Sequence, residues 1–328
     1  MKICRKTICS QKRLRDNNQC KSKFNFIFKY TLLFPHQTPM KHLIFSFVFF
    51  SLAVLSVSAN DVIVAPDAAV EKIADGFGFT EGPAVDSAGN LFFVDDPNSK
   101  IHKWSVDKKL SVFVEESEHA NGMYFGKDDI LYVCEGGTGC VVAYDKNAKR
   151  TVIASQYEGK RFNKPNDLWV DPKGGIYFTD PVYGKDFKVV QDGEHVYYIS
   201  PDIKSVKQVT NDLLRPNGLV GTPDGKTLYI TDEKGRKVWK YDIQPDASIT
   251  NKTLFYENGI DGMTIDKNGN VYITVTEVIV LNPAGKEIAR IKVPETPSNV
   301  CFGGKDKKTL YITARKSVYQ VKTNIGGN

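Results

Sequence analysis

Six short polar segments of this chain each hold one residue whose side chain carries an oxygen that could bind a metal. These residues recur about every 43 positions and are Glu81, Asn121, Asn166, Asn217, Asp261 and Asn299. Oxygen donors with two formal negative charges suit a hard divalent cation, calcium first, with zinc, manganese and magnesium as alternatives. Glycine follows four of the six, which lets the backbone approach a central object closely. Taken singly, Asn-Gly and Asp-Gly are also ordinary turn dipeptides.

The residues after each polar segment predict a β-hairpin. An apolar stretch is followed by a turn rich in Gly, Asp and Asn, and then by a second apolar stretch such as Leu91–Val94 or Leu228–Thr231. Further strands follow in most units, which gives about four strands per unit. Six such units predict an all-β fold, a six-bladed β-propeller with a central metal site. Ala69–Ile73 is expected to complete the last blade and close the ring.

In a propeller the polar segments would meet at one mouth of the channel, because each segment precedes the innermost strand of its blade. The second strand of a blade returns to the same mouth, so Asp180 and Asp232 are expected nearby in a second layer. Activation of a water molecule at such a metal site needs a base that takes its proton. Asp261 is the first candidate and Asp232 the second, with a strand-end cap as the alternative role of Asp232. No G-x-S-x-G nucleophile elbow is present, which disfavours a covalent serine mechanism.

The first 59 residues are interpreted as segments outside the fold. Residues 1–39 carry nine basic residues and one acid, and we expect them to lie upstream of the true start at Met40. Residues 40–59 have a basic start, an apolar run and a small-x-small end, which are the parts of a signal peptide with Asn60 as the first mature residue. The alternatives are a long basic leader and an uncleaved anchor. Residues 60–328 then form a single propeller domain that is secreted or periplasmic.

Removing the basic leader changes what the composition implies. The whole chain has a formal net charge of +6, but the remaining part is slightly acidic, so nucleic acid is not an expected partner. No stable membrane association is expected after cleavage. Cys134 and Cys140 could form a disulfide in an exported protein, with Cys301 left over. The sequence makes no prediction of oligomeric state.

One stretch is more specific than the rest. Lys164-Pro165-Asn166-Asp167-Leu168 through Thr179-Asp180-Pro181-Val182-Tyr183-Gly184 resembles bacterial gluconolactonases of the senescence-marker-protein/gluconolactonase/luciferin-regenerating-enzyme family. Glu81-Gly82-Pro83, Arg215-Pro216-Asn217-Gly218-Leu219 and Asp261-Gly262-Met263 support the resemblance, which spans residues 70–328.

The resemblance implies a six-bladed propeller with one catalytic divalent metal and hydrolysis of sugar lactones. By matched motif the metal ligands would be Glu81, Asn166, Asn217 and Asp261, with the role of Asn166 divided between metal and substrate. The chain departs from the family pattern at two positions that are expected to touch substrate. Gly136 stands where many gluconolactonase-like chains carry histidine, and Lys164 stands where mammalian relatives carry arginine.

The residues around the predicted mouth suggest how a small lactone would be held. Asn121, Lys164, Tyr183 and Asp180 are the expected substrate contacts, and His119 is a further candidate at the rim or an ordinary surface histidine. A metal-dependent lactonase is the first functional hypothesis. The alternatives are a related aryl or organophosphate esterase and a non-catalytic binding propeller that a metal stabilises.

Overall fold

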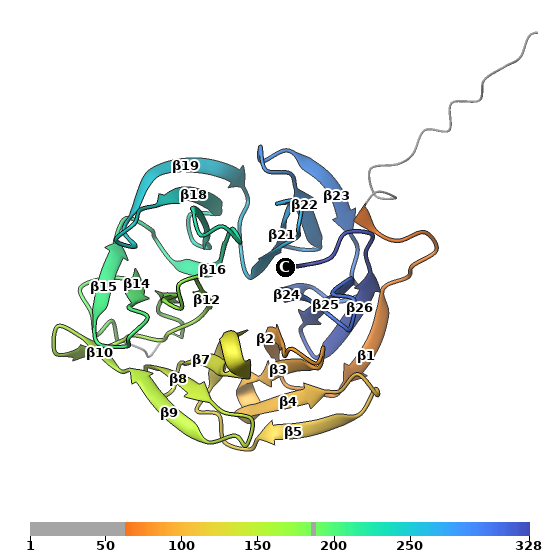
Figure 1. Cartoon of the computed structure of the whole chain (residues 1–328), viewed down its shortest axis with the longest axis horizontal. Helices are drawn as coiled ribbons and strands as arrows, with labels where there is room; N and C mark the ends of the chain where they lie inside the picture. Colours follow the sequence, from red (N-terminus) through yellow and green to blue (C-terminus); the bar gives the residue numbers. More distant parts are fainter. Residues whose placement is uncertain (1–62, 185–187) are drawn as a thin grey trace, which may run out of the picture. The chain divides into compact units, whose positions relative to one another are not determined.

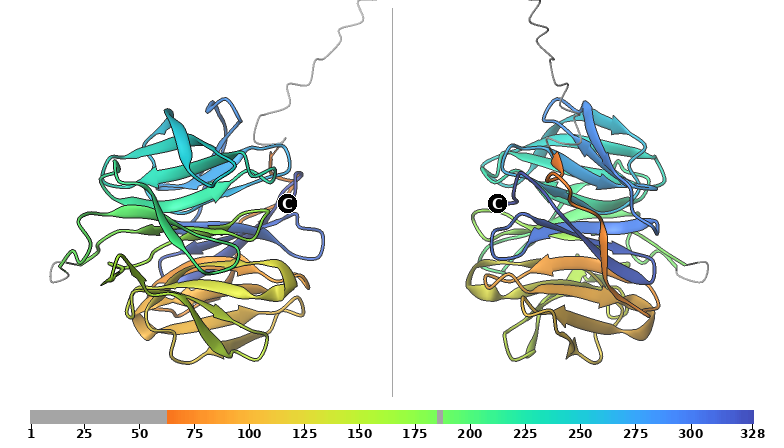
Figure 2. Two further views of the ribbon diagram at one scale, coloured as in Figure 1. Left: turned by 60° about the vertical axis from the view of Figure 1, so that its left-hand side comes forward. Right: turned by 90° about the vertical axis from the view of Figure 1, so that its right-hand side faces the viewer.

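The computed structural model describes residues 63–184 and 188–328, which contain six four-stranded antiparallel sheets. The sheets are arranged as blades around a central channel (Figure 1). Each blade is a twisted sheet when it is seen from the side (Figure 2). The predicted all-β, six-bladed propeller is therefore confirmed. The predicted leader (1–39) and signal peptide (40–59) lie outside the described residues.

The first three blades follow the chain from the inner strand outward. Blade 1 consists of β2 (Thr80–Val85), β3 (Leu91–Asp95), β4 (Lys100–Trp104) and β5 (Leu110–Val114). Blade 2 consists of β6 (Ala120–Phe125), β7 (Leu131–Glu135), β8 (Cys140–Tyr144) and β9 (Arg150–Ala154). Blade 3 consists of β12 (Leu168–Val170), β13 (Ile176–Asp180), β14 (His195–Ile199) and β15 (Val206–Thr210).

The next blades repeat this order. Blade 4 consists of β16 (Pro216–Gly221), β17 (Thr227–Asp232), β18 (Lys237–Ile243) and β19 (Ile249–Glu257), and blade 5 of β20 (Met263–Ile265), β21 (Val271–Thr274), β22 (Val278–Leu281) and β23 (Glu287–Ile291). Blade 6 consists of β24 (Pro297–Gly303), β25 (Thr309–Ala314), β26 (Ser317–Lys322) and β1 (Glu71–Asp75). The remaining elements are the hairpin β10 (Gln156–Tyr157) and β11 (Lys160–Arg161), and the short 3₁₀ helices η1 (Asp96–Asn98) and η2 (Lys127–Asp129).

The ring closes through the first strand of the chain. β1 pairs antiparallel with β26, so that Glu71 lies opposite Gln320 and Asp75 opposite Ser317. The orange β1 lies beside the dark blue β26 in the side view (Figure 2). The prediction that a segment at 69–73 completes the last blade is confirmed, with the strand displaced by two residues.

Aspartate turns set the register of the inner hairpins. In blade 3 the Asp171 Oδ1 accepts the backbone N–H groups of Lys173 (2.7 Å) and Gly175 (2.9 Å). This side-chain turn fixes the chain reversal between β12 and β13 and places Leu168 opposite Phe178. Asp266 plays the same part in blade 5, where it accepts the N–H of Asn270. The turn chemistry read from the sequence therefore leads directly to the hairpins.

The hydrophobic core lies between neighbouring blades. The clusters join facing sheets, for example blades 1 and 2 through Phe92 and Met123, and blades 2 and 3 through Cys134 and Phe178. Burial of these apolar faces is the main stabilising contribution to such a stack of sheets. Because each blade contacts its two neighbours, the blades hold the six inner strands in fixed positions around the channel.

The cysteine pairing allowed by the sequence does not occur in the structure. Cys134 and Cys140 are both free and buried. In the ladder between β7 and β8, Cys134 faces Val141 and Cys140 faces Glu135. Neighbouring pairs in a ladder point to opposite faces of the sheet, so the two thiols lie on different faces and cannot be bridged.

Within residues 63–184 and 188–328, the structure contains no helix that is long and apolar enough to cross a membrane.

Candidate metal centre and active site

Five of the six polar segments meet at one mouth of the channel. They line a cavity of about 230 Å³, formed by Phe79, Glu81, Asp96, His119, Asn121, Gly136, Lys164, Pro165, Asn166, Tyr183, Asn217 and Asp261. The four residues predicted as metal ligands are all in this lining. Asn299, from the sixth segment, lies behind it and donates from Nδ2 to Asp167 Oδ2 (3.2 Å). The structure thus brings together residues that are up to 180 positions apart in the sequence.

Backbone irregularities turn the polar segments toward the channel. The register of the inner hairpin shifts between Glu81 and Ala84 in blade 1 and between Pro216 and Leu219 in blade 4. A bulge of this kind re-aims a side chain and bends the strand. Adjacent segments are also bonded to each other, since Gly122 N–H donates to the Asn166 carbonyl at 2.6 Å. The segments of blades 2 and 3 are therefore bonded directly to each other at the mouth.

Glycine is required where two segments approach most closely. Gly82 has a φ of +48°, and a Cβ at this position would overlap the Asn121 carbonyl oxygen. A Cβ at Gly218 would overlap the Asp261 carbonyl oxygen in the same way. The close approach of neighbouring backbone segments therefore explains the glycines that follow the ligand-type residues in the sequence.

Buried carboxyl groups dominate the electrostatics of the cavity. Burial raises the pKa of Glu81 well above its usual range, and the nearby Asp261 charge raises it further. Burial likewise raises the pKa of Asp261 to about 7, while a hydrogen bond from Asn217 opposes the shift. Removing two carboxylates from water is unfavourable unless a positive charge balances them. A bound cation would reverse both shifts by favouring the ionised forms.

The carboxamide side chains of the site also indicate a missing partner. Asn166 Oδ1 is buried and accepts no hydrogen bond from the described residues. Asn217 Nδ2 donates to the Tyr183 hydroxyl at 2.8 Å. A buried carbonyl oxygen without a partner calls for an explanation, and a cation is one. The residues present therefore fit a divalent cation with oxygen ligands.

The donor set differs from that of a site rich in thiolate or imidazole. Among the described residues, no group of three or more His, Cys, Asp or Glu side chains is arranged to hold a metal. The candidate centre consists instead of two carboxyl groups and two carboxamides, all of them oxygen donors. Such a set is typical of calcium and other hard cations.

The aspartates at the ends of second strands lie outside the cavity lining. They accept backbone N–H groups from the segment that enters the first strand of the same blade: Asp95 from Gly78 and Phe79, Asp180 from Asn163, and Asp232 from Leu214 and Arg215. Asp180 is fully buried and Asp232 nearly so. The predicted second base, Asp232, and the predicted substrate contact, Asp180, therefore lie outside the cavity lining, and each accepts backbone N–H groups through one carboxyl oxygen.

The other predicted substrate contacts do line the cavity. Asn121, Lys164 and Tyr183 are all part of its wall. Burial raises the pKa of Tyr183, so its hydroxyl stays protonated, and the Arg215 guanidinium lies 5.1 Å from the centre of its ring. Phe79 completes the wall and was not foreseen from the sequence. Its position two residues before Glu81 was the available signal.

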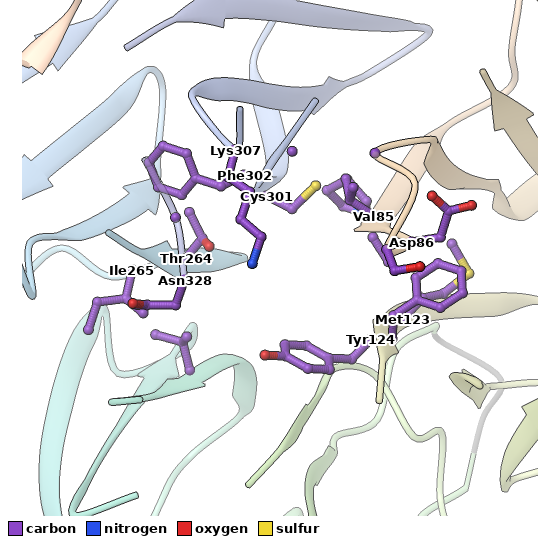
Figure 3. A pocket seen from close by; sticks show the side chains of 18 of the residues that line it. Val85, Asp86, Met123, Tyr124, Thr264, Ile265, Cys301, Phe302, Lys307 and Asn328 are labelled. Atoms are coloured by element: carbon purple, nitrogen blue, oxygen red, sulfur yellow. The ribbon is translucent and has the colours of Figure 1, made fainter. Parts of the chain in front are cut away.

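A larger cavity of about 350 Å³ lies at the other ends of the same inner strands (Figure 3). Tyr124 and Lys307 point into it from different blades (Figure 3). Its two aspartate carboxylates already accept hydrogen bonds: Asp86 accepts the Asn90 N–H at 2.8 Å within its own turn, and Asp129 accepts from Ser87 of the neighbouring blade. The cavity contains none of the six ligand-type residues. The four predicted metal ligands therefore lie at the opposite mouth, in the smaller cavity.

Comparison with known proteins gives the family of the chain. The family model described as the SMP-30/gluconolactonase/LRE-like region matches residues 79–316. A gluconolactonase of Zymomonas mobilis is 33% identical over 304 residues, which cover 81% of this chain and 85% of the relative. A regucalcin of Pongo abelii is 30% identical over 253 residues, covering 72% of this chain and 83% of the relative.

A solved structure agrees with these sequence matches. A gluconolactonase from Xanthomonas campestris is 25% identical with a TM-score of 0.76, over 80% of this chain and 92% of that chain. The polar segments, the propeller and the matches therefore lead to one conclusion. The chain belongs to the SMP-30/gluconolactonase/LRE-like family, as the resemblance in its sequence predicted.

Proposed function

We propose that this protein hydrolyses small lactones with the help of a divalent cation, calcium first, held by Glu81, Asn166, Asn217 and Asp261. One observation carries the proposal: two buried carboxyl groups with raised pKa values share a cavity with the unpartnered Asn166 Oδ1. The gluconolactonase of Zymomonas mobilis supports a lactone as the substrate class. A sugar lactone is the expected substrate within that class.

The bound cation would supply Lewis-acid chemistry, polarising the lactone carbonyl and stabilising negative charge on its oxygen. In this proposal Asp261 takes a proton from the attacking water. The water oxygen bonds to the carbonyl carbon, the bond to the ring oxygen breaks, and the product is a hydroxy acid.

The walls of the cavity are suited to a compact polar ring. Tyr183 is held by the Asn217 amide and by the Arg215 guanidinium, so its ring presents a fixed surface. Phe79 supplies a second aromatic surface in the lining. Asn121 and Lys164 provide polar groups for substrate hydroxyls. These residues orient the lactone, while the acidic end of the cavity activates it.

The first experiment measures acid release from glucono-1,5-lactone by the purified protein with a pH indicator. We expect turnover with calcium, loss of turnover with a chelator, and a loss of about 10²–10⁴-fold in the Asp261→Asn variant. Asp202→Asn is the control, because this residue lies in an exposed turn. Turnover of aryl or organophosphate esters without turnover of any lactone would favour the esterase alternative. Calcium binding without turnover of either class would favour a binding propeller.

A binding measurement separates the metal site from catalysis. Calcium at 100 times its Kd stabilises a protein by about 2.7 kcal/mol when it binds only the folded state. The melting temperature of the wild type should therefore rise with calcium, whereas that of Glu81→Gln should not. Equal shifts in the two proteins would contradict the proposed ligand set.

Export is a separate part of the proposal and rests on the sequence of residues 40–59. N-terminal sequencing of the protein recovered from the producing cells should begin at Asn60 if the signal peptide is cleaved as expected. A mature protein that begins at Met1 or Met40 would contradict this assignment.

A further inference from the structure

A histidine and an aspartate that the proposed mechanism does not use face each other in the cavity wall. His119 Nδ1 lies 3.3 Å from Asp96 Oδ1, and both residues are part of the lining. Their side chains are 56% and 38% exposed. A pair this exposed contributes little to the stability of a fold. Stability therefore gives no reason for the pair, and its place in the wall of the candidate site makes it a candidate for a role in that site.

The backbone that carries His119 is strained. Glu118 and His119 have φ values of +54° and +53°, in the left-handed region that is costly for residues other than glycine. The surroundings hold this conformation in place. Ser99 Oγ accepts the His119 N–H at 2.9 Å, and the Gly136 and Gly137 N–H groups donate to the carbonyls of His119 (3.0 Å) and Glu118 (2.9 Å). Strain that the surroundings enforce in this way tends to occur at functional sites.

Glycine is needed on the opposite side of this contact as well. A Cβ at Gly137 would lie 2.7 Å from the Glu118 carbonyl oxygen and 3.4 Å from His119 Cδ2. A larger residue would therefore push the histidine loop away from the cavity. The loop between β7 and β8 thus packs closely against the His119 ring.

The two ring nitrogens of His119 have different surroundings. Nδ1 faces Asp96, whereas Nε2 makes no hydrogen bond to any residue in 63–184 or 188–328. A carboxylate beside one ring nitrogen fixes the orientation of the imidazole. The other nitrogen then remains available to exchange a proton with a ligand in the cavity.

We infer that His119 is the general acid of this site, donating the Nε2 proton to the departing ring oxygen of the lactone, with Asp96 as its positioning residue. The inference rests on the proposed lactonase function. Asp261 removes a proton from water as the C–O bond forms, and the ring oxygen takes a proton from His119 as its bond to the carbonyl carbon breaks. Solvent then returns a proton to His119 and accepts the one on Asp261. The sum is lactone plus water giving a hydroxy acid.

The leaving group provides a sharp test. An aliphatic alcohol is a very weak acid, so its alkoxide is a poor leaving group and needs a proton when it departs. A phenol has a pKa of about 10, so a phenolate departs with much less help. Loss of a general acid should therefore affect an aliphatic lactone strongly and a phenolic lactone weakly. Glucono-1,5-lactone and dihydrocoumarin represent the two classes.

The experiment compares kcat for both lactones in wild type, His119→Gln and Asp96→Asn. We expect His119→Gln to lower kcat about 10²-fold or more on the aliphatic lactone and less than about tenfold on dihydrocoumarin. Asp96→Asn should show the same selectivity with a smaller loss. Added imidazole should restore part of the lost activity in a His119→Ala variant.

The control is a second His–Asp pair elsewhere in the same protein. His195 Nε2 lies 2.6 Å from Asp192 Oδ1, and neither residue lines the cavity. Asp192→Asn should leave both activities unchanged, and melting temperatures verify that every variant is folded. Equal losses on the two lactones in His119→Gln would overturn the inference alone. Turnover of neither lactone by the wild type would overturn the proposed function and this inference with it.

Discussion

The side chain of Lys164 crosses directly over Gly136. A Cβ at Gly136 would lie 3.3 Å from Lys164 Cε and the same distance from the His119 carbonyl oxygen. The two departures from the family pattern noted in the sequence are therefore one structural feature. The missing side chain at 136 creates the space through which the lysine stem passes along the cavity wall.

We expect a Gly136→His variant to displace Lys164 and to alter substrate binding more than chemistry. The new side chain would compete for the space of the lysine stem, and overpacking of this kind forces neighbouring groups to move. The prediction is a KM on glucono-1,5-lactone raised about tenfold, or about 1.4 kcal/mol, with kcat changed less. Steady-state kinetics on the variant measures this, and Lys164→Met tests the amino group separately. An unchanged KM in both variants would show that this wall does not contact substrate.

Asp232 should prove to be a structural residue. Its Oδ1 accepts N–H groups from Leu214 (3.2 Å) and Arg215 (2.9 Å), just before the segment that holds Asn217. Replacement of a hydrogen-bonded buried carboxylate costs about 1–3 kcal/mol. Asp232→Ala should therefore lower the melting temperature, while kcat of the folded fraction falls much less than in Asp261→Asn. A loss of kcat in Asp232→Ala as large as that in Asp261→Asn would restore Asp232 as a candidate base.

Gly82 should tolerate no side chain. An added methyl group would overlap the Asn121 carbonyl, and the φ of +48° is unfavourable for alanine. Strain and overlap together should cost about 2–4 kcal/mol and weaken calcium binding, because Glu81 precedes this residue directly. The matched control is Gly159→Ala. That position also has a positive φ, of +78°, but a Cβ there would meet no atom within 4 Å. The loss of melting temperature in the Gly82 variant reports atomic overlap and backbone strain together, whereas the loss in Gly159→Ala reports backbone strain alone.

Asp180 gives a prediction of pH dependence. Burial raises its pKa from 3.8 to about 7 in the folded protein. The folded state therefore holds a proton that the unfolded state releases, and stability from this group falls as the pH rises from about 4 to about 7. The full difference is at most about 4 kcal/mol. The melting temperature of the wild type minus that of Asp180→Asn should decrease over this range and stay constant above pH 8. An increase over the same range would contradict the raised pKa.

The fold could be predicted from the sequence because its period is set locally. Each turn of the Asp171 type needs only a few neighbouring residues, and six repeats of such a hairpin leave few ways to bury the apolar faces. The inward position of Glu81 and Asn217 followed from the same period. Both residues are the second residue of an inner strand, Glu81 in β2 and Asn217 in β16, and inner strands surround the channel.

Other features depended on details that spacing does not contain. Asp232 and Asp261 are both acids near one channel mouth, but the first turns its carboxylate to backbone amides and the second to the cavity. Asp96 belongs to the lining although it lies outside the repeated polar segments. The thiols of Cys134 and Cys140 are close in sequence, yet the parity of the β7–β8 register separates them. Each of these outcomes depends on side-chain direction, which tertiary packing decides.

The closure of blade 6 by β1 also determines when folding of the propeller can be completed. Gln320 Nε2 donates to Glu71 Oε2 across 249 positions of sequence, so the first strand to be synthesised must wait for the last. Contacts of such sequence separation form slowly because a large loop must be closed first. Until β1 pairs with it, β26 presents an open edge to which another strand could add. A newly synthesised chain therefore has an unpaired edge strand, to which strands of other molecules can add, until β1 pairs with β26. Deletion of residues 71–75 would leave that edge unpaired permanently.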